Sequence, residues 1–273
     1  MNLHMRLVAV AALAYLGGCS QAPALVPAHE VPQLRPGIPA GYLARSALPD
    51  SLALLVPPPA RGSAAWEADE EAYRSTRALR GSGRWKQAID DAALGFPKAA
   101  GAFSCALGVS ITPQETPRAY LLLRRTLVDS ALATYAAKDR YARERPFIAN
   151  SQPSCTPAEE ASLAKEGSYP SGHAALGWAW ALVLAELVPE RTDALLQRGE
   201  TYGQSRVICG VHWQSDIDAG RLVAAGAVAR LHAEPAFLAD MQAARQEIRQ
   251  AQAARVAPSR DCLAEAKALG GAP

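Results

Sequence analysis

Hydrophobic residues recur with helical spacing over most of the chain after residue 61. Within 85–93 and again within 121–135, apolar side chains fall at positions three, four and seven apart, which form one buried face of a helix. The segment 174–187 is apolar almost all round, which predicts a central helix that is buried on most sides. Further helices are predicted over 192–202, 216–231 and 235–254.

Alternating β-branched residues joined by hairpin turns are missing from this region. The predicted fold class is therefore all-α, with a single bundle-like helical domain over residues 61–273. Residues 19–60 differ, because nine of the chain's twenty prolines lie between Gln21 and Ala60 and no periodicity is sustained there. We interpret this segment as a Pro-rich tether, either an extended linker or an arm that wraps the body.

The composition of the 273-residue chain limits the classes of function. Lys and Arg total 28 against 26 Asp and Glu, and this near balance argues against a nucleic-acid-binding surface. Hydrophobic residues make up 49% of the chain, so a sizeable core can form. No apolar run after the N-terminal segment is long enough to predict a membrane-spanning helix.

The N-terminal residues indicate export. An apolar run over 7–16 follows Arg6; it is short for a bilayer span but suits the central region of a signal peptide. Small residues and then Cys19 follow, and together they resemble a bacterial lipobox, in which the cysteine is lipidated and becomes the new N-terminus. We expect a signal peptide over 1–18 and a periplasmic protein attached to the outer membrane through Cys19. The alternative is an ordinary secretory signal in which Cys19 is incidental.

Four cysteines are left once Cys19 is set aside, and an even number in an oxidising compartment is compatible with two disulfides. They form no C-x-x-C pair, and no histidine stands at zinc-ligand spacing from them. We favour pairing Cys105 with Cys155 and Cys209 with Cys262. Spacing does not fix this connectivity, and four buried free thiols are the alternative.

Two segments carry groups that suit an anion. Lys138 and Arg145 are seven residues apart, almost two helical turns, which predicts that both cations project from one helix face. Pro170-Ser171-Gly172-His173 leads into the apolar helix, with Pro170 suited to its first turn. The amides of the next three residues would then be free at a helix N-terminus, and His173 could give a proton there. The alternatives are a solvated helix face and a simple helix start with an incidental histidine.

A third segment adds a candidate nucleophile. His212 and Asp216 are four residues apart, and on a helix face the carboxylate would hold one imidazole nitrogen as N–H and leave the other free to attack. Ser205 and Arg206 precede them, and Gly210 would let the chain bend so that the guanidinium reaches the same anion. A surface hydrogen bond is the alternative for the histidine–aspartate pair.

In this order and spacing, the three segments resemble the signature of the type 2 phosphatidic acid phosphatase superfamily, K-x6-RP, PSGH and SR-x5-H-x3-D, and every fixed position is filled. The residues around the second and third segments look like those of class A bacterial non-specific acid phosphatases. The resemblance runs from about 61 to about 255. It implies an all-α domain of the type shared by these phosphatases and the vanadium haloperoxidases.

The resemblance also implies roles. His212 would attack phosphorus and form a phosphohistidine, Asp216 would orient it, and His173 would protonate the leaving alcohol. No metal or other cofactor is expected, because fixed cations can neutralise the phosphoryl oxygens. The implied phosphate-binding residues are Lys138, Arg145, Ser171, Gly172 and Arg206.

The implied substrates are small organic phosphate monoesters of broad range, and related enzymes are often homo-oligomers. Activity should rise toward mildly acidic pH, because the general acid must be protonated. The alternatives are a vanadate-dependent haloperoxidase and an anchored phosphate-binding lipoprotein without catalysis. A membrane-lipid phosphatase would carry several transmembrane helices. Outside the motifs, Tyr169 and Trp213 are candidates for the leaving-group pocket, and Glu70 and Glu71 for its border.

Overall fold

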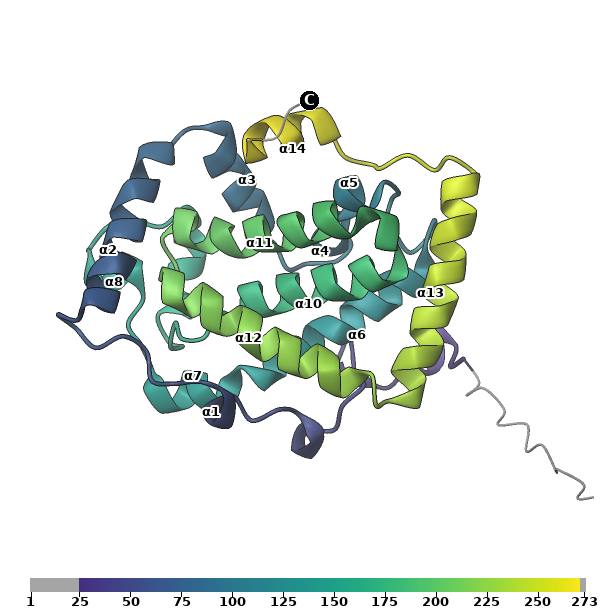
Figure 1. The fold of residues 1–273 in the computed structure, drawn as a ribbon, viewed down its shortest axis with the longest axis horizontal. Coiled ribbons are helices and arrows are strands. Elements are labelled where there is room, and N and C mark those ends of the chain that lie inside the picture. Colours follow the sequence, from purple (N-terminus) through teal and green to yellow (C-terminus); the bar gives the residue numbers. More distant parts are fainter. Residues whose placement is uncertain (1–24, 271–273) are drawn as a thin grey trace, which may run out of the picture.

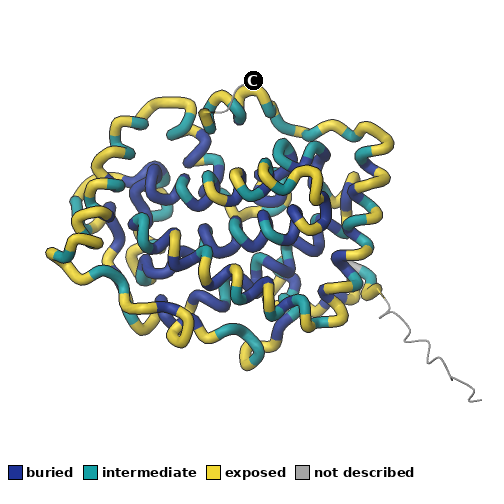
Figure 2. The backbone as a smooth tube through the Cα atoms, in the orientation of Figure 1, coloured by how far each residue is buried: buried dark blue, intermediate teal, exposed yellow. Residues whose placement is uncertain are grey.

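The computed structural model describes residues 25–270, whose regular secondary structure is almost entirely helical (Figure 1). The longest helices form the body: α6 (Pro117–Ala133), α10 (Gly172–Leu187), α11 (Thr192–Cys209), α12 (Gln214–Leu231) and α13 (Pro235–Ala253). Helix α10 packs against α6, α11 and α12, and most of its side chains are buried (Figure 2). The all-α fold and the central place of the helix predicted over 174–187 are both confirmed.

Shorter helices surround this body. They are α2 (Ala64–Thr76), α3 (Gly83–Ala92), α4 (Lys98–Gly101), α5 (Ser104–Leu107), α7 (Tyr135–Tyr141), α8 (Pro146–Ala149), α9 (Glu160–Leu163), α14 (Cys262–Leu269), and the 3-10 turns η3 (Arg77–Leu79), η4 (Pro157–Glu159) and η5 (Pro189–Arg191). The stripe over 85–93 lies in α3, and that over 121–135 lies in α6 and the start of α7. Helix α11 is longer than the predicted 192–202. It ends only where Gly210 takes a left-handed φ of 80°.

The described part of the Pro-rich segment, residues 25–60, lies along α6 and α7. It contains η1 (Ala28–Glu30), the antiparallel pair β1 (Gln33–Arg35) and β2 (Ile38–Pro39), η2 (Arg45–Ala47) and α1 (Ser51–Leu54). The carboxylate of Asp129 accepts the amides of Tyr42 and Leu43 at 2.8 and 3.1 Å, and a Cβ on Gly41 would collide with it. The hydroxyl of Ser51 accepts the amide of Ala137 at 3.0 Å. This part of the predicted tether is therefore packed on the body.

All four of the remaining cysteines form disulfides, but the pairing we favoured from the sequence is wrong. Cys105 bonds Cys262, and Cys155 bonds Cys209. Packing decides the partners: α14 returns to the body beside α5 and α3, and the loop after α8 returns to the end of α11, where the amide of Cys155 donates to the carbonyl of Cys209 at 2.8 Å. The first of the four cysteines therefore pairs with the last, and the two between them pair with each other.

The predicted signal peptide over 1–18 and Cys19 lie outside the described residues. Within residues 25–270, no single helix has both the length and the apolarity of a membrane span; α12 and α13 reach them only as a pair bent by 97°.

Candidate active site

The three sequence motifs meet at one end of α10. Lys138 comes from α7, Arg145 from the start of α8, His173 from the first turn of α10, and Arg206 from the last turns of α11. His212 lies in the short connection between α11 and α12. Contacts between the motifs join them directly: Lys138 Nζ donates to the carbonyl of Pro170 at 3.0 Å, and Arg145 Nη1 lies 3.2 Å from His212 Nε2.

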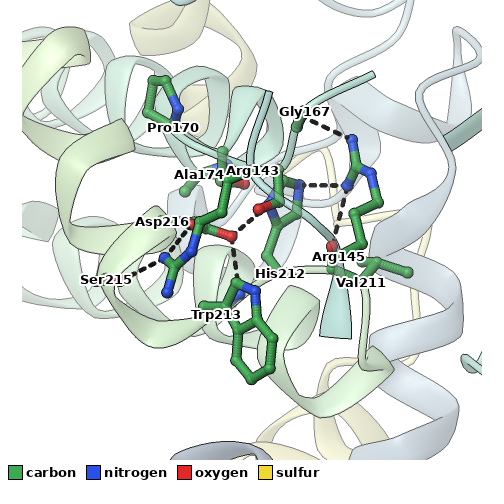
Figure 3. A network of polar contacts seen from close by, with 12 residues as sticks. Arg143, Arg145, Gly167, Pro170, Ala174, Val211, His212, Trp213, Ser215 and Asp216 are labelled. Atoms are coloured by element: carbon green, nitrogen blue, oxygen red, sulfur yellow. Dashed lines mark hydrogen bonds and ion pairs between the residues drawn. The ribbon is translucent and has the colours of Figure 1, made fainter. Parts of the chain in front are cut away.

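His212 is almost fully buried, and its two ring nitrogens face different partners (Figure 3). Nδ1 lies 3.3 Å from the carboxylate of Asp216, and Nε2 faces the guanidinium of Arg145. Because a guanidinium can only donate, the hydrogen-bond pattern assigns the proton to Nδ1 and a lone pair to Nε2. Burial and then the neighbouring cation of Arg145 hold the pKa of His212 well below its usual range. The imidazole is therefore neutral, and the lone pair of Nε2 points to the cation of Arg145.

The histidine and its aspartate do not share a helix face, contrary to the prediction. Helix α12 begins after Trp213, so His212 precedes it, and Asp216 lies in its first turn. The carboxylate of Asp216 also accepts the amide of Trp213 at 2.9 Å, as in a helix cap. Asp216 thus fixes the start of α12 and the ring of His212 with the same group.

A buried chain of charges that no sequence motif marks continues behind Asp216. Arg143 donates to Asp216 through Nη1 and to Asp69 through Nη2, both at 2.7 Å. Asp69, from α2, also accepts the amide and hydroxyl of Ser215. Arg143 opposes the rise that burial causes in the pKa of Asp216. Asp69 is not flagged by any motif; its spacing of four from buried Tyr73 is the signal that it lies on the inner face of α2.

Lys138 and Arg145 reach the site from separate elements. The prediction that they share a helix face is wrong, because α7 ends at Tyr141, Ala142 is left-handed at φ 42°, and Arg145 begins α8. Lys138 donates to the carbonyls of Gly167 and Pro170, and burial lowers its pKa to about 8. Burial also lowers the pKa of Arg145 to about 10. Both cations therefore stay charged at neutral pH.

Arg206 is the third cation, and its guanidinium is fully buried. None of its three nitrogens has a hydrogen-bond partner among the described residues. Burial lowers the pKa of Arg206. A buried guanidinium without partners is costly, so its presence beside two more cations indicates a site built for an anion.

The first turn of α10 offers fewer amides to that anion than predicted. Ser171 is the N-cap, its hydroxyl accepts the amide of Ala174, and its own amide donates to the carbonyl of Asp216 at 2.9 Å. Pro170 therefore precedes the helix instead of lying in its first turn. The amides of Gly172 and His173 have no acceptor within the described part of the chain. A Cβ on Gly172 would meet nothing closer than 4.0 Å, so the space beside its amide is open.

His173 is held on two sides. Its Nε2 lies 3.0 Å from the carbonyl oxygen of Ala92, and its ring stacks on Tyr202 with centroids 6.4 Å apart. Since a carbonyl can only accept, Nε2 carries a proton and Nδ1 is the nitrogen available to a substrate. Burial and then Arg206 hold the pKa of His173 well below its usual value. A bound anion would offset the charge of Arg206 and raise that pKa.

The aromatic residues flanking the motifs are structural. Trp213 is in the core with its Nε1–H donating to the carbonyl of Glu144 at 2.8 Å, and the hydroxyl of buried Tyr169 donates to the carbonyl of Val56 in the arm at 2.9 Å. Over residues 25–270, no three His, Cys, Asp or Glu side chains are grouped so that they could hold a metal ion.

The chain is similar to known proteins of one family. Residues 119–235 match the family model described as the PAP2 superfamily. The chain is 49% identical over 207 residues to a non-specific acid phosphatase of Providencia stuartii, covering 76% of this chain and 84% of that protein. It is 46% identical over 195 residues to a non-specific acid phosphatase of Salmonella typhimurium (71% and 78%), and 40% identical over 209 residues to an acid phosphatase of Zymomonas mobilis (77% and 79%).

Among solved structures, a bacterial vanadium-dependent iodoperoxidase gives a TM-score of 0.41 at 18% identity, over 65% of this chain and 53% of the other.

Proposed function

Because this chain belongs to the class A non-specific acid phosphatases of the PAP2 superfamily, we propose that it hydrolyses a broad range of phosphate monoesters through a phosphohistidine on His212. It is a phosphomonoesterase, as its similarity to three proteins named acid phosphatases indicates. The observation that best supports the phosphohistidine is the partnerless, buried guanidinium of Arg206 beside a neutral His212 whose unprotonated Nε2 faces the guanidinium of Arg145.

In the first step, Nε2 of His212 forms a bond to phosphorus while the bond from phosphorus to the ester oxygen breaks. Nδ1 of His173 gives its proton to that oxygen, so the alcohol leaves neutral. The N–H at Nδ1 of His212 stays on the carboxylate of Asp216, which stabilises the positive ring. Lys138, Arg145 and Arg206 balance the charge on the phosphoryl oxygens.

In the second step, His173 takes a proton from water as the water oxygen bonds to phosphorus and the N–P bond to His212 breaks. Inorganic phosphate leaves, and both histidines return to their starting protonation states. The backbone amides of Gly172 and His173 can donate to the phosphoryl oxygens in both steps.

The test of this proposal is direct trapping of the intermediate. A monoester labelled in its phosphate group should leave label on His212 when the reaction is stopped at alkaline pH, where the phosphohistidine bond survives. The label should be found by peptide mapping, and a His232→Ala protein should carry as much of it, because His232 pairs with Glu186 outside the site. Label on another residue, or none during turnover, would reject the phosphohistidine.

The pKa of His173 predicts how activity depends on pH. The general acid works only when protonated, so activity is lost as pH rises through its pKa. In the free enzyme this pKa is well below 6.5, so kcat/KM should fall with rising pH from mildly acidic values. Bound phosphoryl charge raises the pKa, so kcat should fall only at higher pH. Steady-state profiles of both constants check this.

The control for the pH profile is His173→Asn, which keeps a polar side chain but cannot protonate. Ionisation of the substrate affects both proteins equally, so the alkaline fall of kcat should disappear only in the variant. An unchanged alkaline limb in His173→Asn would assign the general acid to another group.

We also propose that the enzyme is periplasmic and anchored through a lipid on Cys19. The two disulfides support an oxidising compartment, and the lipobox-like residues before Cys19 support the anchor. The mass of the mature N-terminal peptide decides between a lipidated cysteine and an ordinary signal-peptide cleavage.

A further inference from the structure

Asp91, in the last turn of α3, is a buried carboxylate that no motif includes. Its oxygens accept from both terminal nitrogens of Arg198, at 2.5 and 3.2 Å. They also accept the hydroxyl of Ser205 at 2.6 Å and the side-chain amide of Gln87 at 2.8 Å. Both Arg198 and Ser205 belong to α11, so Asp91 ties the end of α3 to the helix that carries Arg206.

The residue after Asp91 is the one that holds His173. The carbonyl of Ala92 accepts from Nε2 of that histidine at 3.0 Å, and Ala92 is the last residue of α3. Nothing else in the described chain hydrogen-bonds the ring of His173. The place of this carbonyl therefore sets which ring nitrogen faces the substrate and how far it reaches.

We propose that Asp91 is a positioning residue for the general acid: by fixing α3 to α11, it places the Ala92 carbonyl that holds His173 with Nδ1 toward the leaving oxygen. This rests on the proposed role of His173 as acid. It also gives Ser205 of the SR pair a role, since its hydroxyl is one of the groups that hold Asp91.

Asp69 supports the proposed nucleophile, and Asp91 supports the proposed general acid. Asp69 reaches His212 through Arg143 and Asp216, whereas Asp91 reaches His173 through the backbone of Ala92. A defect in the nucleophile slows attack on every ester. A defect in the acid slows only esters whose alcohol must be protonated as it leaves.

The experiment compares Asp91→Asn with wild type on two substrates, an alkyl phosphate and dinitrophenyl phosphate, whose phenolate leaves without a proton. The loss of kcat/KM should be about tenfold or more larger on the alkyl ester, because general acids contribute about 100-fold or more to such steps. Asp69→Asn is the matched control, and it should lower kcat/KM for both substrates by similar factors. His173→Asn should show the largest preferential loss on the alkyl ester.

The outcomes separate the inference from the mechanism beneath it. If His173→Asn loses kcat/KM by the same factor on both substrates, the assignment of the general acid fails. The role of Asp91 is overturned if His173→Asn loses more kcat/KM on the alkyl ester than on dinitrophenyl phosphate, but Asp91→Asn lowers kcat/KM equally for both substrates or for neither. Should Asp91→Asn fail to fold, Ser205→Ala removes one of the same hydrogen bonds. It should shift the ratio in the same direction by a smaller factor, and an unchanged ratio would overturn the proposal.

Discussion

Replacing His212 with alanine should lower kcat for phosphate monoesters by about 10⁴-fold or more, the range seen when a nucleophile is removed from a unit of cooperating groups. The variant keeps Arg206, Lys138 and Arg145, so it should still bind inorganic phosphate. The loss should therefore appear in kcat while phosphate continues to inhibit and to raise the thermal midpoint. Steady-state kinetics and thermal melts with phosphate measure the two effects.

His232→Ala is the control for this variant. His232 is partly exposed and pairs with Glu186 at 2.7 Å, so its removal should leave kcat near the wild-type value. Turnover of His212→Ala close to wild type would refute the assignment of the nucleophile, because another group would then have to attack phosphorus.

Arg206→Met should have two effects of opposite sign. Hydrolysis should fall by about 100-fold or more, since a charge that stabilises the transition state is gone. The free protein should become more stable by about 1–4 kcal/mol, because an apolar side chain replaces a buried, partnerless cation. Urea unfolding in a buffer free of phosphate measures the gain, and phosphate should no longer stabilise the variant as it does the wild type.

Arg145→Met is the matched comparison within the same cluster of cations. Arg145 donates to the carbonyls of Leu163 at 2.8 Å and Val211 at 3.0 Å, so its removal leaves buried acceptors unpaired. This variant should lose about 1–3 kcal/mol of stability while it also loses activity. If both arginine variants were destabilised alike, Arg206 would stabilise the free protein, and its assignment as a partnerless anion-binding residue would be wrong.

The long helices could be predicted from the sequence because their apolar periodicity is strong. The helix over 174–187 is apolar on nearly every face, and only a central position can bury such a surface. The motif residues could also be predicted to meet, because the chemistry of one phosphate requires them together. The local geometry was harder: Lys138 and Arg145 fit one helix by spacing, yet the left-handed Ala142 breaks it between them.

What the sequence could not predict depends on contacts between distant segments. Asp and Arg are residue types that usually lie at the surface. Only the packing of α2 against α12 buries Asp69 and Arg143 as partners. The predicted disulfide pairing was wrong because the spacing of the cysteines does not show that α14 returns to α5. Asp91 likewise acquires its importance only because α3 ends beside His173.

The packing of residues 40–56 on the body also bears on the order in which contacts form during folding. Residues 40–56 leave the ribosome early, but their partners come much later in the chain: the hydroxyl of Tyr42 donates to Asp240 at 2.7 Å, 198 residues away. Such distant contacts close slowly and late in folding. Ser51, which supports the helix carrying Lys138, belongs to this segment. We therefore expect residues 40–56 to be among the last segments to pack, and the support that Ser51 gives to the helix of Lys138 to form late in folding.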